Sequence, residues 1–74
     1  MPRPPAISGQ EAVRAFEKAG WTAARQRGSH VALTKPGSIF TLSIPLHDEL
    51  GPGLLRDQIR KAGLTVQEFI ALLQ

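Results

Sequence analysis

The sequence predicts an α+β fold, in which three antiparallel strands form one sheet and helices cover one of its faces. Three observations support this prediction. Apolar residues recur at helical spacing near both ends of the chain, they alternate with polar residues in its middle, and glycine or proline marks the boundaries between these segments. Because the turns between the strands are short, the strands are expected to form an antiparallel meander, and the apolar helix faces need a sheet face to cover.

The first helix is predicted from Ser8 to about Ala19. Ser8 and Glu11 have the spacing of a capping box, in which each side chain accepts a hydrogen bond from a backbone amide that the helix leaves free. Gly20 is expected to end the helix in a left-handed conformation. The residues expected on the buried stripe of this helix are Ala12, Val13 and Phe16.

Three strands are predicted over residues 21–27, 29–35 and 39–44, separated by turns at Gly28 and at residues 36–38. Side chains alternate between the two faces of a strand. The residues expected on the face that the helices cover are Val31, Leu33, Phe40, Leu42 and Ile44. The residues of the second strand expected on the uncovered face are His30, Ala32 and Thr34.

Two further helices are predicted after the strands. The second covers residues 54–62 and is stopped by Gly63, and its expected buried residues are Leu55, Ile59 and Ala62. The third, shorter helix begins at a capping box formed by Thr65 and Glu68. Its apolar residues at helical spacing are Val66, Phe69, Ile70 and Leu73.

Length and composition exclude several classes of protein. A chain of 74 residues is expected to form one small domain, here residues 8–74 after a flexible leader of residues 1–7. The absence of cysteine excludes a disulfide framework and a thiolate metal site, and it is expected of a protein in the reducing cytoplasm. The sequence contains no run of about 18 consecutive apolar residues, the length needed to span a membrane, and the N-terminus lacks the apolar segment of a signal peptide.

The charge balance and one histidine point to a polyanionic substrate. Nine Lys and Arg against six Asp and Glu give a net charge of +3, which favours an approach to nucleic acid. His30 carries an imidazole, which accepts and donates protons near neutral pH, and Arg25 and Arg27 precede it and attract phosphate. The position of His30 on its strand, taken alone, favours an exposed residue without a catalytic role. The motif around His30 is therefore needed to choose between that role and catalysis.

That motif is one of seven that occur in a defined order. They are Ser8-Gly9, Gly20-Trp21, Arg-Gln-Arg-Gly-Ser-His at residues 25–30, Ile-Pro-Leu-His at residues 44–47, Leu55-Arg56, Ala-Gly-Leu-Thr at residues 62–65 and Glu68-Phe69. In this order the chain resembles the HicA-type toxins, small messenger-RNA interferases with a double-stranded-RNA-binding-like α-β-β-β-α fold. One departure is Leu54, which stands where the family usually has threonine. Without that hydroxyl, Gly53 or Asp48 is expected to cap the second helix.

The resemblance implies a metal-independent endoribonuclease that cleaves mRNA, needs no small-molecule cofactor and is controlled by a HicB-type antitoxin. The family's catalytic histidine maps onto His30, as general acid or general base while the 2′-OH of the RNA attacks the adjacent phosphate. The candidate RNA-binding residues are Arg25, Arg27, Gly28, Ser29 and Lys35. Gly28 lets the RNA backbone approach closely, and Ser29 either donates a hydrogen bond to a phosphate oxygen or only closes the turn.

Other conspicuous residues have plainer interpretations. His47 is a candidate for a second titrating group, but after Pro45 it is interpreted as a loop residue that helps to cap the second helix. Trp21 is interpreted as a core residue rather than one that stacks on a base. Residues 48–49 are both acidic but have no further carboxylate or histidine at a regular spacing, so no metal site is expected. The cationic residues Arg56, Arg60 and Lys61 either contact phosphates or form a solvated helix face.

Two other functions fit the same sequence. One is a non-catalytic RNA-binding module of the same fold, and the other is a domain whose open sheet face binds a protein. Both stay open because a fold alone does not establish an activity.

Overall fold

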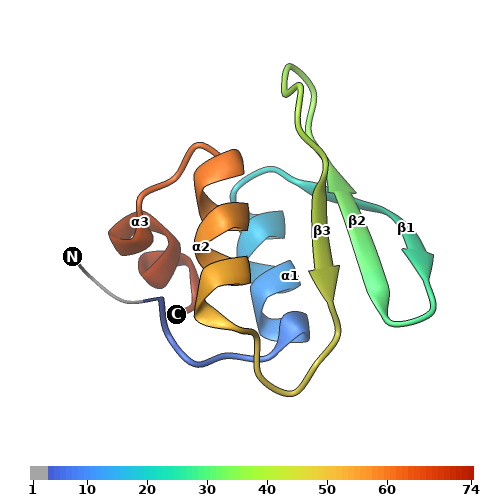
Figure 1. Ribbon diagram of the computed structural model, residues 1–74. Coiled ribbons are helices and arrows are strands. Elements are labelled where there is room, and N and C mark those ends of the chain that lie inside the picture. Colours follow the sequence, from blue (N-terminus) through green and yellow to red (C-terminus); the bar gives the residue numbers. More distant parts are fainter. Residues whose placement is uncertain (1–3) are drawn as a thin grey trace.

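A computed structural model describes residues 4–74 of the chain (Figure 1). The elements in chain order are α1 (Gly9–Lys18), β1 (Thr22–Arg27), β2 (His30–Thr34), β3 (Leu42–Pro45), α2 (Pro52–Lys61) and α3 (Val66–Leu72). This order confirms the predicted α+β fold with its three-stranded antiparallel sheet and its final short helix.

The sheet has the strand order β1-β2-β3, and the helices lie on one side of it (Figure 1). From this side α1 contacts both β1 and β3, and α2 contacts β3, although all six residues of the edge strand β1 are exposed. The buried apolar residues between helices and sheet are Ile7, Ala12, Ala15, Phe16, Trp21, Val31, Leu33, Leu42, Ile44, Leu50, Leu55, Ile59 and Phe69. The opposite sheet face stays uncovered and is called the open face below.

Both predicted capping boxes form. Ser8 accepts a hydrogen bond from the Glu11 amide at 3.1 Å and starts α1, and Thr65 accepts one from the Glu68 amide at 3.0 Å and starts α3. The two helices meet through Phe16 and Phe69, whose ring centroids are 4.9 Å apart. Local sequence therefore fixes where these helices begin, and aromatic packing joins them.

The start of α2 differs from the prediction. The helix begins at Pro52 rather than at residue 54, and its N-cap is Gly51 rather than Gly53 or Asp48. Proline suits the first turn because the backbone N–H that it lacks would have no partner inside the helix. Gln58 is buried on this helix, and its side-chain oxygen accepts a hydrogen bond from the Ser43 amide at 3.0 Å, which joins α2 to β3.

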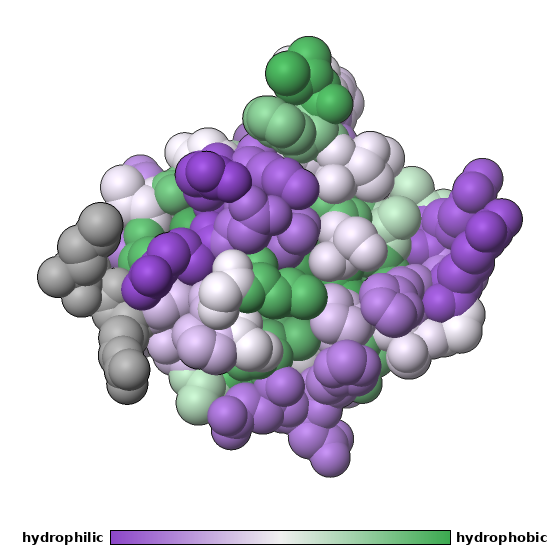
Figure 2. Space-filling view, in the orientation of Figure 1, coloured by the Kyte–Doolittle hydropathy of each residue, from purple (hydrophilic) through white to green (hydrophobic). Residues whose placement is uncertain are grey.

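The third strand is also shorter than predicted, since it begins at Leu42 instead of residue 39. Phe40 was expected on the covered face but is 46% exposed, and Ile39 is 92% exposed. The Ser38 hydroxyl accepts a hydrogen bond from the Phe40 amide and donates one to the Phe40 carbonyl. These local bonds replace the pairing that a strand would need. The β2–β3 connection consequently projects from the molecule as the hydrophobic tip in Figure 2.

The segment before α1 packs on the domain. Residues 1–7 were expected to form a flexible leader, and residues 1–3 lie outside the part of the chain that the structure describes. Pro4 is buried, Ile7 is only 8% exposed, and the Ile7 carbonyl accepts a hydrogen bond from the Leu50 amide at 2.8 Å. Ile7 therefore belongs to the core.

Candidate functional site

His30 is the first residue of β2, and its side chain lies on the open face. Val31 and Leu33 point to the other side and are buried beneath the helices, whereas His30 is exposed. This is the face on which strand alternation predicts the imidazole. The ring is accordingly accessible to a large substrate such as a nucleic acid.

Two arginines reach the same face through an irregularity in β1. The register pairs Ala23 with Leu33, then shifts, and pairs Arg25 with Ala32 and Arg27 with His30. Regular pairing from Ala23 onward would place Arg25 opposite Val31, on the covered side, because a slip of one residue exchanges the faces of a strand. The β-bulge thus places Arg25 and Arg27 on the same face of the sheet as His30.

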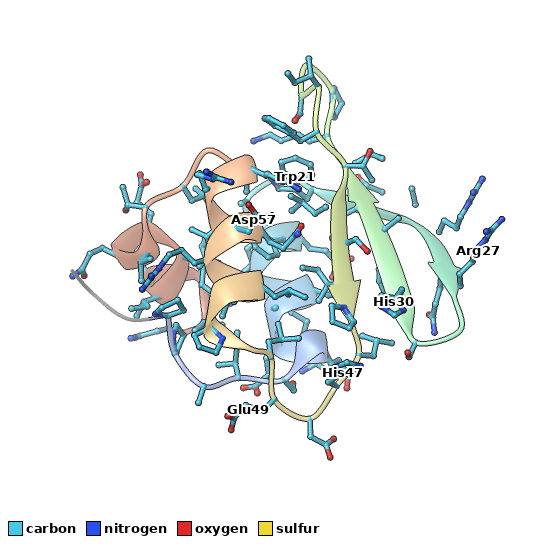
Figure 3. All side chains as sticks on the ribbon, in the orientation of Figure 1. Trp21, Arg27, His30, His47, Glu49 and Asp57 are labelled. Carbon is cyan, nitrogen blue, oxygen red and sulfur yellow. The ribbon has the colours of Figure 1, made fainter. Side chains whose placement is uncertain are left out.

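A shallow hollow of about 160 Å³ lies between these side chains. Its lining residues are Arg25, Arg27, His30, Ala32 and Ser43. Figure 2 shows a strongly hydrophilic surface at this edge of the molecule, and Figure 3 places the labelled Arg27 there. The hollow joins cationic groups to an imidazole, which is the pairing that a phosphodiester requires for binding and proton transfer.

The turn between β1 and β2 joins the strands that carry Arg27 and His30. Gly28 has a φ of +54°, a conformation that other residues rarely adopt, and a Cβ built on it would meet no atom within 4 Å. The Gln26 side chain donates a hydrogen bond to the Gly28 carbonyl at 3.0 Å. Ser29 follows, and its carbonyl accepts a hydrogen bond from the Leu46 amide. The turn is therefore compact, bonded to the segment after β3, and free of side-chain bulk at Gly28.

His47 joins this end of the sheet, which sequence reasoning did not foresee. Its ring centroid is 6.4 Å from that of His30, and the rings meet edge to face at 73° (Figure 3). The interpretation of His47 as a cap of α2 is wrong, since Gly51 occupies the N-cap position and no side chain caps it. The available signal was the second histidine of the chain, which ends the motif at residues 44–47.

Lys35 lies away from the hollow. It follows the far end of β2, and its position five residues after His30 in an extended strand corresponds to about 16 Å, at about 3.3 Å per residue. Its ammonium group donates a hydrogen bond to the Ala19 carbonyl at 3.1 Å, at the end of α1. Of the candidate RNA-binding residues, the structure therefore gathers Arg25, Arg27, Gly28 and Ser29 around His30, and places Lys35 elsewhere.

The cations of α2 are partly engaged within their own helix. Asp57 forms ion pairs with Arg60 and with Lys61, the latter at 3.1 Å. Hydrogen bonds from Lys61 and Arg60 hold the pKa of Asp57 below its ordinary value. Trp21 is 3% exposed and belongs to the core, as predicted, so it offers no ring for a base to stack on.

Among residues 4–74, no helix is long and apolar enough to cross a membrane. Within the same range, no three or more His, Cys, Asp and Glu side chains gather in a way that could hold a metal ion.

Fold and site together define a small α+β domain with a cationic, histidine-containing open sheet face. The family model described as HicA toxin of bacterial toxin-antitoxin matches residues 9–64, from the start of α1 to the turn after α2. The chain therefore belongs to the HicA toxin family, which confirms the resemblance seen in the motifs. As a member it is the toxin of a toxin-antitoxin pair and has an antitoxin as its partner. A comparison with curated proteins finds no match.

Proposed function

We propose that this toxin is an endoribonuclease that cleaves mRNA in the cytoplasm, with His30 as a general acid or base. The observation that supports this most directly is the register of the hairpin, in which Arg27 lies opposite His30 and Arg25 lies on the same face. A group that moves protons thus stands beside two groups that bind phosphate. Membership of the HicA toxin family supports the same activity.

RNA supplies its own nucleophile, so the demands on the protein are modest. The 2′-OH attacks the neighbouring phosphorus once its proton is removed, and the leaving 5′-oxygen needs a proton in return. Arg25 and Arg27 stabilise the negative charge that grows on the phosphate oxygens during the attack. Gly28 admits the RNA backbone, and Ser29 donates a hydrogen bond to a phosphate oxygen. Lys35 contacts a different phosphate, farther along the RNA.

None of these roles needs a metal or a small-molecule cofactor, and we propose that cleavage is metal-independent. The physiological inhibitor in this proposal is a HicB-type antitoxin that covers the open face. Its contact surface is acidic, because it competes with RNA phosphates for the same two arginines.

Incubation of the purified protein with single-stranded RNA in EDTA tests this proposal. We expect cleavage that survives chelation and decreases as salt rises, since Lys and Arg displace counterions when they bind RNA. Loss of cleavage in EDTA with recovery in magnesium would contradict the metal-independent mechanism. Binding without cleavage would instead identify an RNA-binding module, and neither binding nor cleavage would identify a protein-interaction domain.

A further inference from the structure

The second histidine is held in place by backbone contacts on both sides. The Leu46 amide, just before His47, donates a hydrogen bond to the carbonyl of Ser29, just before His30. The Gly9 amide donates another to the His47 carbonyl at 2.9 Å. A Cβ on Gly9 would lie 1.9 Å from the Pro45 carbonyl oxygen, so α1 meets this segment as closely as a glycine allows. The segment after β3 is therefore fixed against both α1 and the β1–β2 turn.

The geometry of the two rings suits one phosphodiester. His30 and His47 come from different parts of the fold, are both exposed, and have ring centroids 6.4 Å apart. An imidazole nitrogen that moves a proton lies about 3 Å from the oxygen concerned. Rings at this separation can therefore contact two different oxygens of a phosphate that lies over them. Figure 3 shows both labelled rings at the same end of the sheet, close to the β1–β2 turn.

The reaction proposed above has two proton transfers at two different oxygens. One proton leaves the 2′-oxygen as it attacks phosphorus, and another must reach the 5′-oxygen as its bond to phosphorus breaks. A single imidazole would have to serve both oxygens in turn. Two imidazoles, one neutral and one protonated, can serve both oxygens at once.

We propose that His47 is a second catalytic residue that forms an acid–base pair with His30, an inference that rests on the proposed ribonuclease activity. The neutral ring of the pair takes the proton of the 2′-OH, and the protonated ring gives its proton to the 5′-oxygen. The bond from the 2′-oxygen to phosphorus forms and the bond to the 5′-oxygen breaks. The products are a 2′,3′-cyclic phosphate and a 5′-hydroxyl. The ring that took the 2′-OH proton ends protonated, and the ring that gave its proton to the 5′-oxygen ends neutral.

The charged groups around the two histidines are consistent with one ring acting as base and the other as acid. Arg25 and Arg27 line the hollow on the β1 side of His30, whereas His47 lies on the β3 side, so the arginines contact phosphate oxygens next to His30. Asp48 and Glu49 directly follow His47 in the loop before α2, and both are exposed. The site thus provides cations for the phosphate and separate imidazoles for its two oxygens.

The test compares His47→Gln and His30→Gln with wild type in single-turnover cleavage of an RNA whose cleaved linkage has been mapped. Each variant should lose about 10²-fold or more in rate, the usual contribution of a general acid or base, while its Kd for RNA stays within a few-fold of wild type. Glu49→Gln, which changes an exposed neighbour of His47, is the matched control and should cleave at the wild-type rate. Circular dichroism should be unchanged in all three.

Two readouts separate catalysis from a structural role. The rate of wild type should pass through a maximum as pH rises, and each histidine variant should lose one limb of this profile, a different limb for each. An RNA with sulfur in place of the bridging 5′-oxygen has a leaving group that needs no acid. It should restore the rate of one histidine variant and not of the other.

The outcomes distinguish the two proposals. If wild type does not cleave RNA, the proposed function fails and the pair fails with it. If wild type and Glu49→Gln cleave but His47→Gln also keeps more than a tenth of the rate and both pH limbs, the pair is overturned and the proposed function stands. If His47→Gln folds poorly, His47→Asn replaces it under the same criteria.

Discussion

The Gly9 amide donates a hydrogen bond to the His47 carbonyl at 2.9 Å, and this bond ties the first turn of α1 to the segment that follows β3. The contact is close enough to exclude any side chain, because a Cβ at Gly9 would lie 1.9 Å from the Pro45 carbonyl oxygen. Gly9, at the start of the first helix, therefore sets the position of His47, which lies 38 residues further along the chain (47 − 9).

We predict that Gly9→Ala destabilises the fold and slows RNA cleavage. The added methyl group must push the Pro45 backbone away, and forced overpacking costs about 1–3 kcal/mol. Chemical denaturation measures the change in the free energy of unfolding. Gln10→Ala, at the exposed next position of α1, is the control and should leave that free energy nearly unchanged. Equal stability of Gly9→Ala and wild type would show that the contact is not tight.

We predict that His30→Ala abolishes RNA cleavage without disturbing the fold. The side chain is exposed on the open face, so its removal leaves no cavity in the core. Loss of a general acid or base lowers the rate by about 10²-fold or more. The measurements are RNA cleavage, the circular-dichroism spectrum and the melting temperature. Cleavage above about a tenth of the wild-type rate would refute the role of His30.

We predict that Arg25→Gln combined with Arg27→Gln weakens RNA binding and makes it less sensitive to salt. Each lost phosphate contact on a single strand reduces the slope of log K against log salt by about 0.7, so the double variant should lose about 1.4. Arg14→Gln, exposed on α1, removes a charge away from the hollow and serves as the control. Equal slopes for the double variant and wild type would place the RNA elsewhere.

The sequence predicts the local features of this fold well and its long-range ones poorly. Ser8 and Thr65 start their helices where predicted because capping boxes depend on residues only three positions apart. Strand alternation likewise places His30 on the open face. Phe40 follows the same alternation but lies outside the sheet, because the Ser38 hydroxyl forms hydrogen bonds with the Phe40 backbone. The alternation of apolar residues gives no sign of these bonds.

The candidate site depends on features that no local pattern reveals. Arg25 reaches the open face through a β-bulge, which only the pairing of β1 with β2 shows. His47 approaches His30 because backbone bonds link residues from three separate segments. Lys35 is five positions from His30 in the sequence, yet an extended strand carries it about 16 Å away at about 3.3 Å per residue. Proximity in the sequence and proximity in the site are different properties here.

We predict that Gln58→Ala destabilises the protein although no function is assigned to this residue. Its side-chain oxygen accepts a hydrogen bond from the Ser43 amide at 3.0 Å in a partly buried setting, and loss of such a hydrogen bond costs about 0.5–1.5 kcal/mol. Thermal and chemical denaturation measure the loss. Gln67→Ala, an exposed glutamine of α3, is the matched control and should be nearly neutral. If both variants lose equal stability, the link between α2 and β3 contributes nothing specific.

The last prediction concerns control by the antitoxin. In this proposal the antitoxin inhibits the toxin by covering the open face, with acidic groups against Arg25 and Arg27. Diethyl pyrocarbonate modifies accessible imidazoles, and the chain has two histidines, so the His47→Gln variant reports on His30 alone. We expect this variant to react freely when unbound and to be protected in a stable complex with the antitoxin. The same complex of the wild-type toxin should leave RNA intact.

Raising the salt concentration should weaken the complex, because acidic and basic surfaces attract less strongly under screening. A stable complex in which His30 still reacts and RNA is still cut would refute direct occlusion and place the antitoxin on another surface.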